Sequence, residues 1–175
     1  MEIVHTTTVD SPIGTLRIVS TRRGLAYVEL PHASGRGLDG WLRRCLPDAR
    51  CESSVAPNQV AAKQLIEYLE GERREFDLGI DPRGTEFQLK VWDALLEIPY
   101  GGTCSYSDIA SRVGCPSAVR AVGSANGANP ISLVVPCHRV INADGKLGGY
   151  GGGLVLKRKL LAMEQAQRPN QGCLL

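Results

Sequence analysis

No apolar run in the 175-residue sequence reaches the length that a membrane-spanning helix needs. The N-terminus, residues 1–6, also lacks the basic segment and following apolar segment that mark a secretory signal peptide. The six cysteines include no Cys-x-x-Cys pair, and we interpret them as reduced thiols of an intracellular protein. Together these absences predict a cytoplasmic protein that has no membrane partner.

The sequence also lacks a large excess of positive or negative charge, since its formal net charge is only +2 at pH 7. Residues 1–84 hold 11 basic and 12 acidic side chains, and residues 85–175 hold 9 basic and 6 acidic ones. A strongly basic domain would indicate nucleic-acid binding unaided, and this sequence has none. The small excess in the second half suits only a limited set of phosphate contacts.

A recognisable metal-binding spacing is also missing. His5, His32, Cys45 and Cys51 could meet in the N-terminal part, but their spacing matches no strong zinc pattern. We therefore expect no metal site. The alternative is a zinc site in the N-terminal part, formed by these four residues.

The first half has the pattern of a small sheet with helices. Alternating apolar residues predict an antiparallel meander over residues 3–9, 15–20 and 25–30. Helical spacing follows over residues 38–46 and 58–69, and Asn58 is placed to cap the second of these helices. Residues 75–80 are predicted to return as a strand. No catalytic motif occurs in this half, which favours a scaffold domain.

Residues 81–84, Asp-Pro-Arg-Gly, have the composition of a linker. They separate a predicted N-terminal domain of residues 1–81 from a predicted C-terminal domain of residues 85–168. Residues 169–175 are expected to form a disordered tail.

The second half begins with a capping box, Thr85 and Gln88, which predicts a helix. A capped short helix follows over residues 105–114, and Pro116 is expected to open a second helix that ends at Gly127. A helix, a short glycine-containing turn and a helix form the helix-turn-helix pattern. Such a pair can bind DNA or serve only as a packing unit.

The most informative stretch is residues 131–141, Ile-Ser-Leu-Val-Val-Pro-Cys-His-Arg-Val-Ile. Its apolar part, Leu133–Val135, predicts a buried strand that Pro136 must end. Cys137 then lies where a rigid element meets a turn, and His138 follows it. A thiolate is a strong nucleophile, and a neighbouring base can generate it. The pair indicates a reactive cysteine, or alternatively an inert buried cysteine beside a capping histidine.

Residues 148–153, Gly-Gly-Tyr-Gly-Gly-Gly, form a glycine-rich segment before the last predicted helix, residues 154–167. The segment fails the dinucleotide-binding fingerprint because position 154 is leucine, and it lacks the lysine of a P-loop. It fits a loop whose backbone packs against a flat ligand, or alternatively a flexible surface turn.

Residues 135–140, Val-Pro-Cys-His-Arg-Val, resemble the active-site signature of the O6-alkylguanine-DNA alkyltransferases, also called methylated-DNA–protein-cysteine methyltransferases. Further matches keep the family's order at Gln88, Trp92, Tyr106, residues 118–123, Asn129, Pro130, Tyr150 and residues 160–164. Weaker similarity extends to residues 11–16 and 24–25. The resemblance implies an α+β fold with an N-terminal antiparallel-sheet, ribonuclease-H-like domain. The C-terminal domain would be helical and winged-helix-like, with the helix-turn-helix inside it.

The resemblance further implies direct-reversal DNA repair. An alkyl group would pass from O6 of guanine, and from O4 of thymine, to the sulfur of Cys137. The nucleotide must first be flipped out, because the duplex hides O6 in the base stack. The product is a thioether, so each molecule reacts once and needs no cofactor. The implied partner is double-stranded DNA carrying O6-alkylguanine, bound by a monomer.

The resemblance also implies a role for individual positions. Catalysis is assigned to Cys137, His138, Glu164, Asn129 and Tyr106, DNA binding to Arg120, Tyr106, Ser107, Ala118 and Gly123, and base binding to Pro136, Val140, Tyr150 and Gly151. His138 would act on Cys137 through a bridging water while Glu164 orients His138. This pair is expected to lower the pKa of the thiol. Arg120 would fill the gap that the flipped base leaves.

Two other interpretations remain open. A non-reacting alkyltransferase-like protein would bind the lesion and recruit other repair proteins, but such relatives lack the reactive cysteine that stands at position 137. A Cys-His hydrolase or acyltransferase would need an oxyanion hole, which backbone N–H groups of residues 148–153 could supply. A mass change of the Cys137 peptide after mixing with alkylated DNA separates these interpretations from alkyl transfer.

Overall fold

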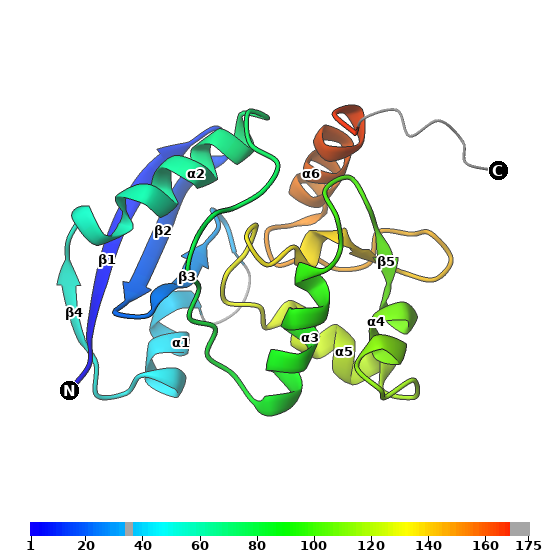
Figure 1. The fold of residues 1–175 in the computed structure, drawn as a ribbon, viewed down its shortest axis with the longest axis horizontal. Helices are drawn as coiled ribbons and strands as arrows, with labels where there is room; N and C mark the ends of the chain where they lie inside the picture. The colour runs from blue at the N-terminus through cyan, green and yellow to red at the C-terminus, as the bar shows by residue number, and fades with distance from the viewer. Residues whose placement is uncertain (34–36, 169–175) are drawn as a thin grey trace.

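The computed structural model describes residues 1–33 and 37–168, and the predicted tail, residues 169–175, lies outside the described residues. The chain forms an α+β fold in which a four-stranded sheet is followed by a mainly helical part (Figure 1). The predicted fold class is therefore confirmed.

The N-terminal sheet contains the predicted meander and one further strand. Its strands are β1 (Ile3–Ser11), β2 (Gly14–Thr21), β3 (Gly24–Glu29) and β4 (Arg50–Ser53). The strand order is β3-β2-β1-β4, with β4 parallel to β1 at the edge. Sequence analysis missed β4 because its four residues, Arg-Cys-Glu-Ser, carry no alternation of apolar and polar side chains.

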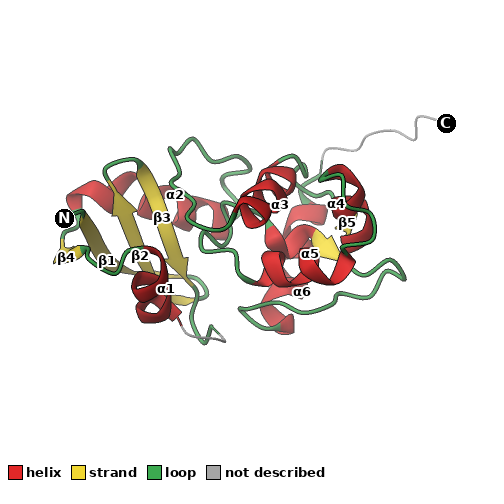
Figure 2. Cartoon of the chain, turned by 90° about the horizontal axis from the view of Figure 1, so that it is seen from below, coloured by secondary structure: helices red, strands yellow, loops and turns green. Residues whose placement is uncertain are grey.

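Two helices cover opposite faces of this sheet (Figure 2). They are α1 (Gly37–Cys45) and α2 (Gln59–Leu69). Because side chains alternate along a strand, Ile18 of β2 packs in the cluster that contains α2, while its neighbour Val19 packs in the cluster with α1. Trp41 of α1 and Leu65 of α2 are both buried in these clusters.

Two predictions in this half are wrong in detail. Asn58 is at the N-cap position of α2 but makes no capping bond, since its Oδ1 accepts from no group among the described residues. Its Nδ2 instead donates to the carbonyls of His5, at 3.0 Å, and Ser54, at 3.2 Å. Residues 75–80 form no strand, since only Ile80 makes an isolated bridge, with Leu25 of β3.

The C-terminal part consists of four helices and a two-stranded parallel sheet. These elements are α3 (Glu86–Leu96), β5 (Cys104–Ser105), α4 (Tyr106–Arg112), α5 (Val119–Gly127), β6 (Val140–Ile141) and α6 (Leu154–Ala166). The predicted capping box is present, since the Thr85 side chain accepts from the Gln88 N–H at 3.2 Å and the Gln88 side chain accepts from the Thr85 N–H at 2.9 Å.

The helix-turn-helix pair, α4 and α5, is confirmed with one shifted boundary. Helix α5 begins at Val119, and neither Pro116 nor Ser117 belongs to it. The Ala118 N–H donates to the Cys115 carbonyl at 2.9 Å, which closes a turn over Pro116 and Ser117.

The predicted buried strand Leu133–Val135 is wrong, because these residues form a tight turn. Leu133 has φ +73°, in the left-handed region that a side chain disfavours. The Asn129 side chain occupies the backbone groups on both sides of the turn. It accepts from the Ile131 N–H at 3.0 Å and donates to the Val135 carbonyl at 2.8 Å. The apolar composition that suggested a strand instead fills the core beneath the turn, where all three residues are buried.

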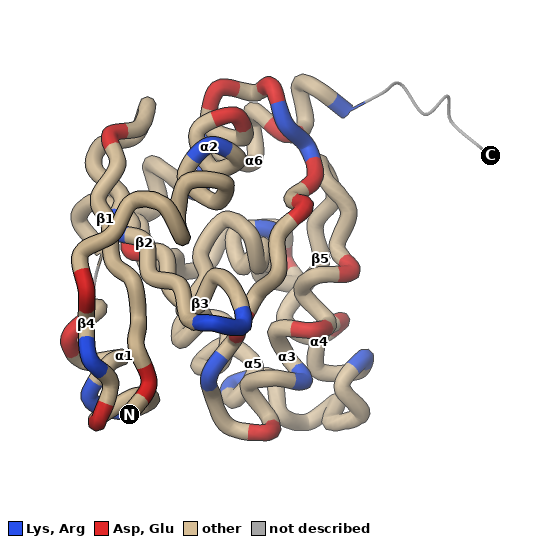
Figure 3. The backbone as a smooth tube through the Cα atoms, turned by 60° about the vertical axis from the view of Figure 1, so that its left-hand side comes forward, with Lys and Arg blue, Asp and Glu red and all other residues tan. Residues whose placement is uncertain are grey.

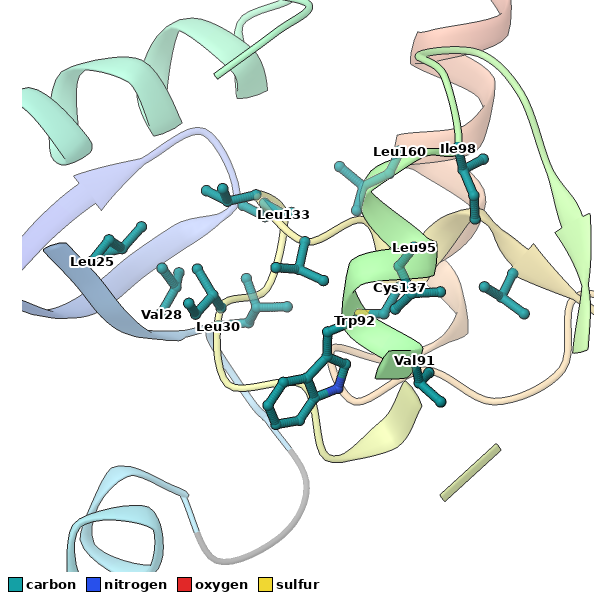
Figure 4. Packing of buried hydrophobic residues seen from close by; sticks show 14 of the residues in the cluster. Leu25, Val28, Leu30, Val91, Trp92, Leu95, Ile98, Leu133, Cys137 and Leu160 are labelled. Carbon is teal, nitrogen blue, oxygen red and sulfur yellow. The ribbon is translucent and has the colours of Figure 1, made fainter. Parts of the chain in front are cut away.

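One hydrophobic core crosses from the sheet to the helical part. Val28 of β3, Leu133 of the turn and Leu95 of α3 belong to the same cluster, and Cys137 lies within it (Figure 4). The Val28 N–H also donates to the Pro130 carbonyl at 2.8 Å. The segments before and after residues 81–84 therefore share apolar packing as well as a backbone hydrogen bond.

Basic and acidic residues are interspersed along the described backbone, with no large stretch of one sign (Figure 3). Within residues 1–33 and 37–168, no helix is long and apolar enough to cross a membrane.

The turn between β2 and β3 generates a prediction about stability. Gly24 has φ +142°, and a Cβ built there would lie 2.4 Å from the carbonyl oxygen of Gly79. Because both the dihedral angle and a backbone atom oppose a side chain, Gly24→Ala should lower the free energy of unfolding by about 2–4 kcal/mol. Gly145→Ala is the control, since Gly145 has φ +85° and open space around it. Its loss should be about 1 kcal/mol. Thermal denaturation of the two variants checks this, and equal losses would contradict the close approach to Gly79.

Candidate active site

Cys137 begins a short 3₁₀ turn, Cys137–Arg139, directly after the tight turn at Leu133. Its side chain is 5% exposed. The Cys137 N–H donates to the Val135 carbonyl at 2.8 Å, and its own carbonyl accepts from Asn126 Nδ2 at 3.3 Å. The backbone of Cys137 is therefore fixed on both sides before any reaction partner arrives.

The thiol lines a cavity of about 560 Å³, a size that fits a purine base with room for its surroundings. Helices α4 and α5 supply Tyr106, Arg120 and Gly123 to the wall, and the glycine-rich loop supplies Tyr150 and Gly151. The cavity also includes Asn129 beside Cys137. Seven of the residues predicted for catalysis, DNA binding or base binding are thus brought together around one hollow.

Other predicted residues lie outside the cavity wall. Ser107 is exposed on the first turn of α4, and Ala118 occupies the N-cap position of α5. Pro136 instead lines a second cavity, together with Tyr100 and Arg139. Val140 is buried, and its carbonyl accepts from Lys157 Nζ at 2.7 Å.

Glu164 of α6 is fully buried, which excludes a solvated surface carboxylate. Arg139 forms a two-point ion pair with it, with Nε 2.9 Å from Oε2 and Nη2 2.9 Å from Oε1. The Gly101 N–H adds a bond of 3.2 Å to Oε2. Burial alone would raise the pKa of Glu164, but hydrogen bonds from His138 and Arg139 lower it to about 2. Glu164 is therefore an anion at neutral pH.

His138, the residue after Cys137, is fully buried and contacts this carboxylate. Its Nε2 lies 2.9 Å from Glu164 Oε1 and 3.1 Å from the hydroxyl oxygen of Tyr68. Because a carboxylate only accepts, Nε2 must carry the proton. Nδ1 is buried and has no hydrogen-bond partner among the described residues. It is the ring nitrogen that is left to take up a proton.

Burial sets the protonation states of the histidine and the thiol. Burial, helped by the charges of Arg139 and Lys157, lowers the pKa of His138 although Glu164 raises it. Burial also raises the pKa of Cys137 despite the opposing effects of Asn129 and Lys157. The expected lowering of the thiol pKa is therefore wrong, because burial outweighs the hydrogen bond from Asn129 and the charge of Lys157. At neutral pH the pair is a neutral thiol beside a neutral imidazole, so the thiol needs a base.

Sequence analysis missed several residues that build the site. Arg139 and Lys157 are buried cations, and Tyr68 and Asn126 supply buried polar groups. Lys157 Nζ also reaches the carbonyls of Leu147 and Gly149, which ties the glycine-rich loop to β6. A signal existed for Lys157, since it stands seven residues before Glu164 and therefore on the same face of α6. No sequence signal pointed to Tyr68, which comes from α2.

The described residues contain no group of three or more His, Cys, Asp or Glu side chains that could hold a metal ion. The candidate site is accordingly built from a thiol, an imidazole, a carboxylate and their hydrogen-bond donors.

Comparisons with known proteins place this geometry in a family. Residues 4–82 match the model described as the 6-O-methylguanine DNA methyltransferase ribonuclease-like domain. Residues 86–166 match the model for the DNA binding domain of the same family.

Individual relatives agree. The methylated-DNA–protein-cysteine methyltransferase of Mycobacterium tuberculosis H37Rv is 47% identical over 170 residues, which cover 95% of this chain and 96% of the relative. The inducible enzyme of that name from Bacillus subtilis is 45% identical, covering 85% of this chain and 83% of the relative.

Solved structures have the same fold. The crystal structure of M. tuberculosis OGT in complex with DNA superposes with a TM-score of 0.79 at 43% identity, and 96% of each chain is covered. The O6-methylguanine-DNA methyltransferase from Pyrococcus kodakaraensis gives a TM-score of 0.61 at 25% identity, over 92% of this chain and 98% of that one. By sequence and by fold, this chain belongs to the 6-O-methylguanine DNA methyltransferase family.

Proposed function

We propose that this protein repairs alkylated DNA by direct reversal, moving an alkyl group from O6 of guanine in duplex DNA to the sulfur of Cys137. The observation that carries the proposal is a buried thiol that lines a base-sized cavity, with a neutral imidazole next to it in the chain and helix α5 at the cavity wall. The names of the relatives and the DNA complex of the M. tuberculosis protein support it. O4 of thymine presents the same alkyl–oxygen bond and is included in the proposed substrate class.

The proposed step balances without a cofactor. His138 Nδ1 takes the proton of the Cys137 thiol, directly or through a water, and the sulfur attacks the alkyl carbon. A carbon–sulfur bond forms while the carbon–oxygen bond breaks, and the electron pair leaves on the O6 oxygen. Glu164 stabilises the imidazolium that forms, in the manner of a base held by a third group.

Tyr106 is proposed to protonate the leaving guanine. Its side chain lines the cavity, and burial raises its pKa, so its phenol remains a proton donor at neutral pH. The product is a thioether on Cys137, which has no easy return to a thiolate. Each molecule therefore acts once, and because one chain carries every group named here, a monomer suffices. We place this action in the cytoplasm, where it has access to chromosomal DNA.

Access to O6 requires that the nucleotide leave the stack. Arg120 is exposed at the start of α5 and also lines the cavity, so it is positioned to occupy the space that the flipped base leaves. The small residues of α5, Gly123 among them, allow its backbone to approach a groove closely. Ser107 and Ala118, at the starts of α4 and α5, are proposed to contact the DNA backbone. Tyr150 and the Gly151 backbone, which line the cavity, are proposed to surround the base together with the backbone at Val140. Pro136 and Asn129 are proposed to hold the turn that carries Cys137.

The first prediction concerns the acceptor. Cys137→Ser should abolish alkyl transfer and leave duplex affinity unchanged, because a hydroxyl is a far weaker nucleophile and α4 and α5 are untouched. Mass spectrometry after mixing with O6-methylguanine DNA should show one added methylene on the Cys137 peptide of the unsubstituted protein.

Two matched controls accompany this variant. Cys115→Ser, at an exposed thiol, and Cys104→Ser, at a half-buried one, should both retain transfer. Alkylation of either thiol in the Cys137→Ser protein would refute the assignment. An unmodified Cys137 with tight lesion binding would instead indicate a non-reacting lesion binder.

The second prediction separates DNA handling from chemistry. Arg120→Ala should slow transfer from duplex DNA by about 10-fold or more, because unstacking a base costs a few kcal/mol that the arginine offsets. Transfer from free O6-benzylguanine should hardly change, since a free base leaves no gap in a stack. Arg112→Ala is the control, an exposed arginine of α4 that does not line the cavity. Equal slowing with both substrates would show that Arg120 acts through the fold.

A further inference from the structure

Tyr68 is a buried tyrosine of the N-terminal part that reaches into the candidate active site. It lies in the last turn of α2 and is fully buried. Its ring packs against Phe76, with 5.3 Å between ring centroids, and meets the edge of Tyr100 at 6.3 Å. The ring is therefore fixed by packing, and the direction of its hydroxyl is fixed with it.

The hydroxyl of Tyr68 makes two contacts, both to the catalytic network. It donates to Glu164 Oε1 at 2.6 Å and lies 3.1 Å from His138 Nε2. Burial raises the pKa of Tyr68 above its ordinary value, and the adjacent Glu164 carboxylate adds to that effect. The phenol therefore keeps its proton and acts as a donor to the carboxylate at every accessible pH.

Glu164 Oε1 accepts from three groups at once: Tyr68, His138 and Arg139. Three donors that share one oxygen compete, so each additional donor weakens the hold of that oxygen on the others. The Tyr68 bond is the shortest of the three. Removal of the Tyr68 hydroxyl should strengthen the bond from His138 to Glu164 more than the bond from Arg139, because Tyr68 also contacts His138.

We infer that Tyr68 is a positioning residue of the alkyl-transfer site, whose hydroxyl limits the pull of Glu164 on His138 and so keeps the imidazole a free base at neutral pH. The inference rests on the proposed function and adds a residue from the N-terminal part to its mechanism. Tyr68 does not line the Cys137 cavity, so it acts through His138 and Glu164.

The remaining ionisable groups near His138 do not replace this effect. Helix α6 presents Glu164 and Lys157, the 3₁₀ turn presents Arg139 and Cys137, and the glycine-rich loop presents Tyr150, whose ring centroid is 6.4 Å from that of His138. Arg139 and Lys157 both disfavour the imidazolium, and burial does so more strongly. Among these neighbours Tyr68 is the neutral group that bonds both members of the His138–Glu164 pair.

The test is the pH dependence of Tyr68→Phe, which removes one oxygen and keeps the ring. With Tyr68 gone, Glu164 should raise the pKa of His138 by about one pH unit, about tenfold in the ratio of protonated to neutral imidazole. A group whose pKa rises becomes protonated at a higher pH. The single-turnover rate of Tyr68→Phe with free O6-benzylguanine should therefore fall below that of the unsubstituted protein. The difference should be larger near pH 6 than near pH 8.

Two readouts make the test decisive. The sequence has three histidines, so the ring signals of His5, His32 and His138 can be followed by NMR titration of the unreacted protein. Only the titration of His138 should move. Tyr27→Phe is the control, because Tyr27 belongs to β3 and packs at a tilt against Trp41, with 5.1 Å between ring centroids. Its pH profile should match that of the unsubstituted protein.

The outcomes separate this inference from the proposed function. If the unsubstituted protein transfers an alkyl group and Tyr68→Phe shows the same pH profile and His138 titration, Tyr68 only supports packing and the inference is wrong. A uniform loss of rate at every pH, with a lower melting temperature, also refutes it. If the unsubstituted protein transfers no alkyl group, the proposed function itself falls.

Discussion

The structure around the Cys137 thiol depends on one buried ion pair, Glu164 with Arg139. The carboxylate is fully buried, and Arg139 offsets part of the loss of its hydration by donating to it at two points. Arg139 lies two residues after Cys137, so the pair joins the 3₁₀ turn that begins at Cys137 to the last helix. The position of His138 follows from this link, because its Nε2 donates to an oxygen that Arg139 already holds. Loss of either charge would leave the other unpaired in the core.

This arrangement favours a neutral thiol and a neutral imidazole over a thiolate–imidazolium pair in the resting site. A fully charged Glu164 beside His138 would favour an imidazolium, and an imidazolium would stabilise a thiolate. Here Arg139 neutralises much of that charge, and burial disfavours ions on both Cys137 and His138. The resting site is thus uncharged at the point of reaction. An uncharged thiol resists oxidation better than a thiolate does, so the buried Cys137 is protected in the resting protein.

The sequence predicted the elements whose signals are local. The capping box at Thr85, the three-strand meander and the helix-turn-helix pair were all recognisable from short patterns. The turn at Leu133 was not, because its positive φ is imposed by Asn129, four residues away, and not by the residues of the turn. Strand β4 depends wholly on pairing with β1. Of the site, the motif at residues 135–140 supplied Cys137 and His138, and the family resemblance supplied Glu164. Tyr68 is brought close only by tertiary packing.

One hydrophobic core joins the segments before and after residues 81–84, and this limits how the chain can be divided or recombined. The two halves match two separate family models, yet β3 shares its packing and a backbone hydrogen bond with the segment that precedes Cys137. A fragment cut at the linker would expose apolar surface on both sides of the cut. The helical half alone would also lose a hydrogen-bond donor to Glu164. A chimera that takes its N-terminal half from a relative must therefore carry β3 and α2 side chains that fit the core of the C-terminal half. The two halves thus depend on each other for their stability.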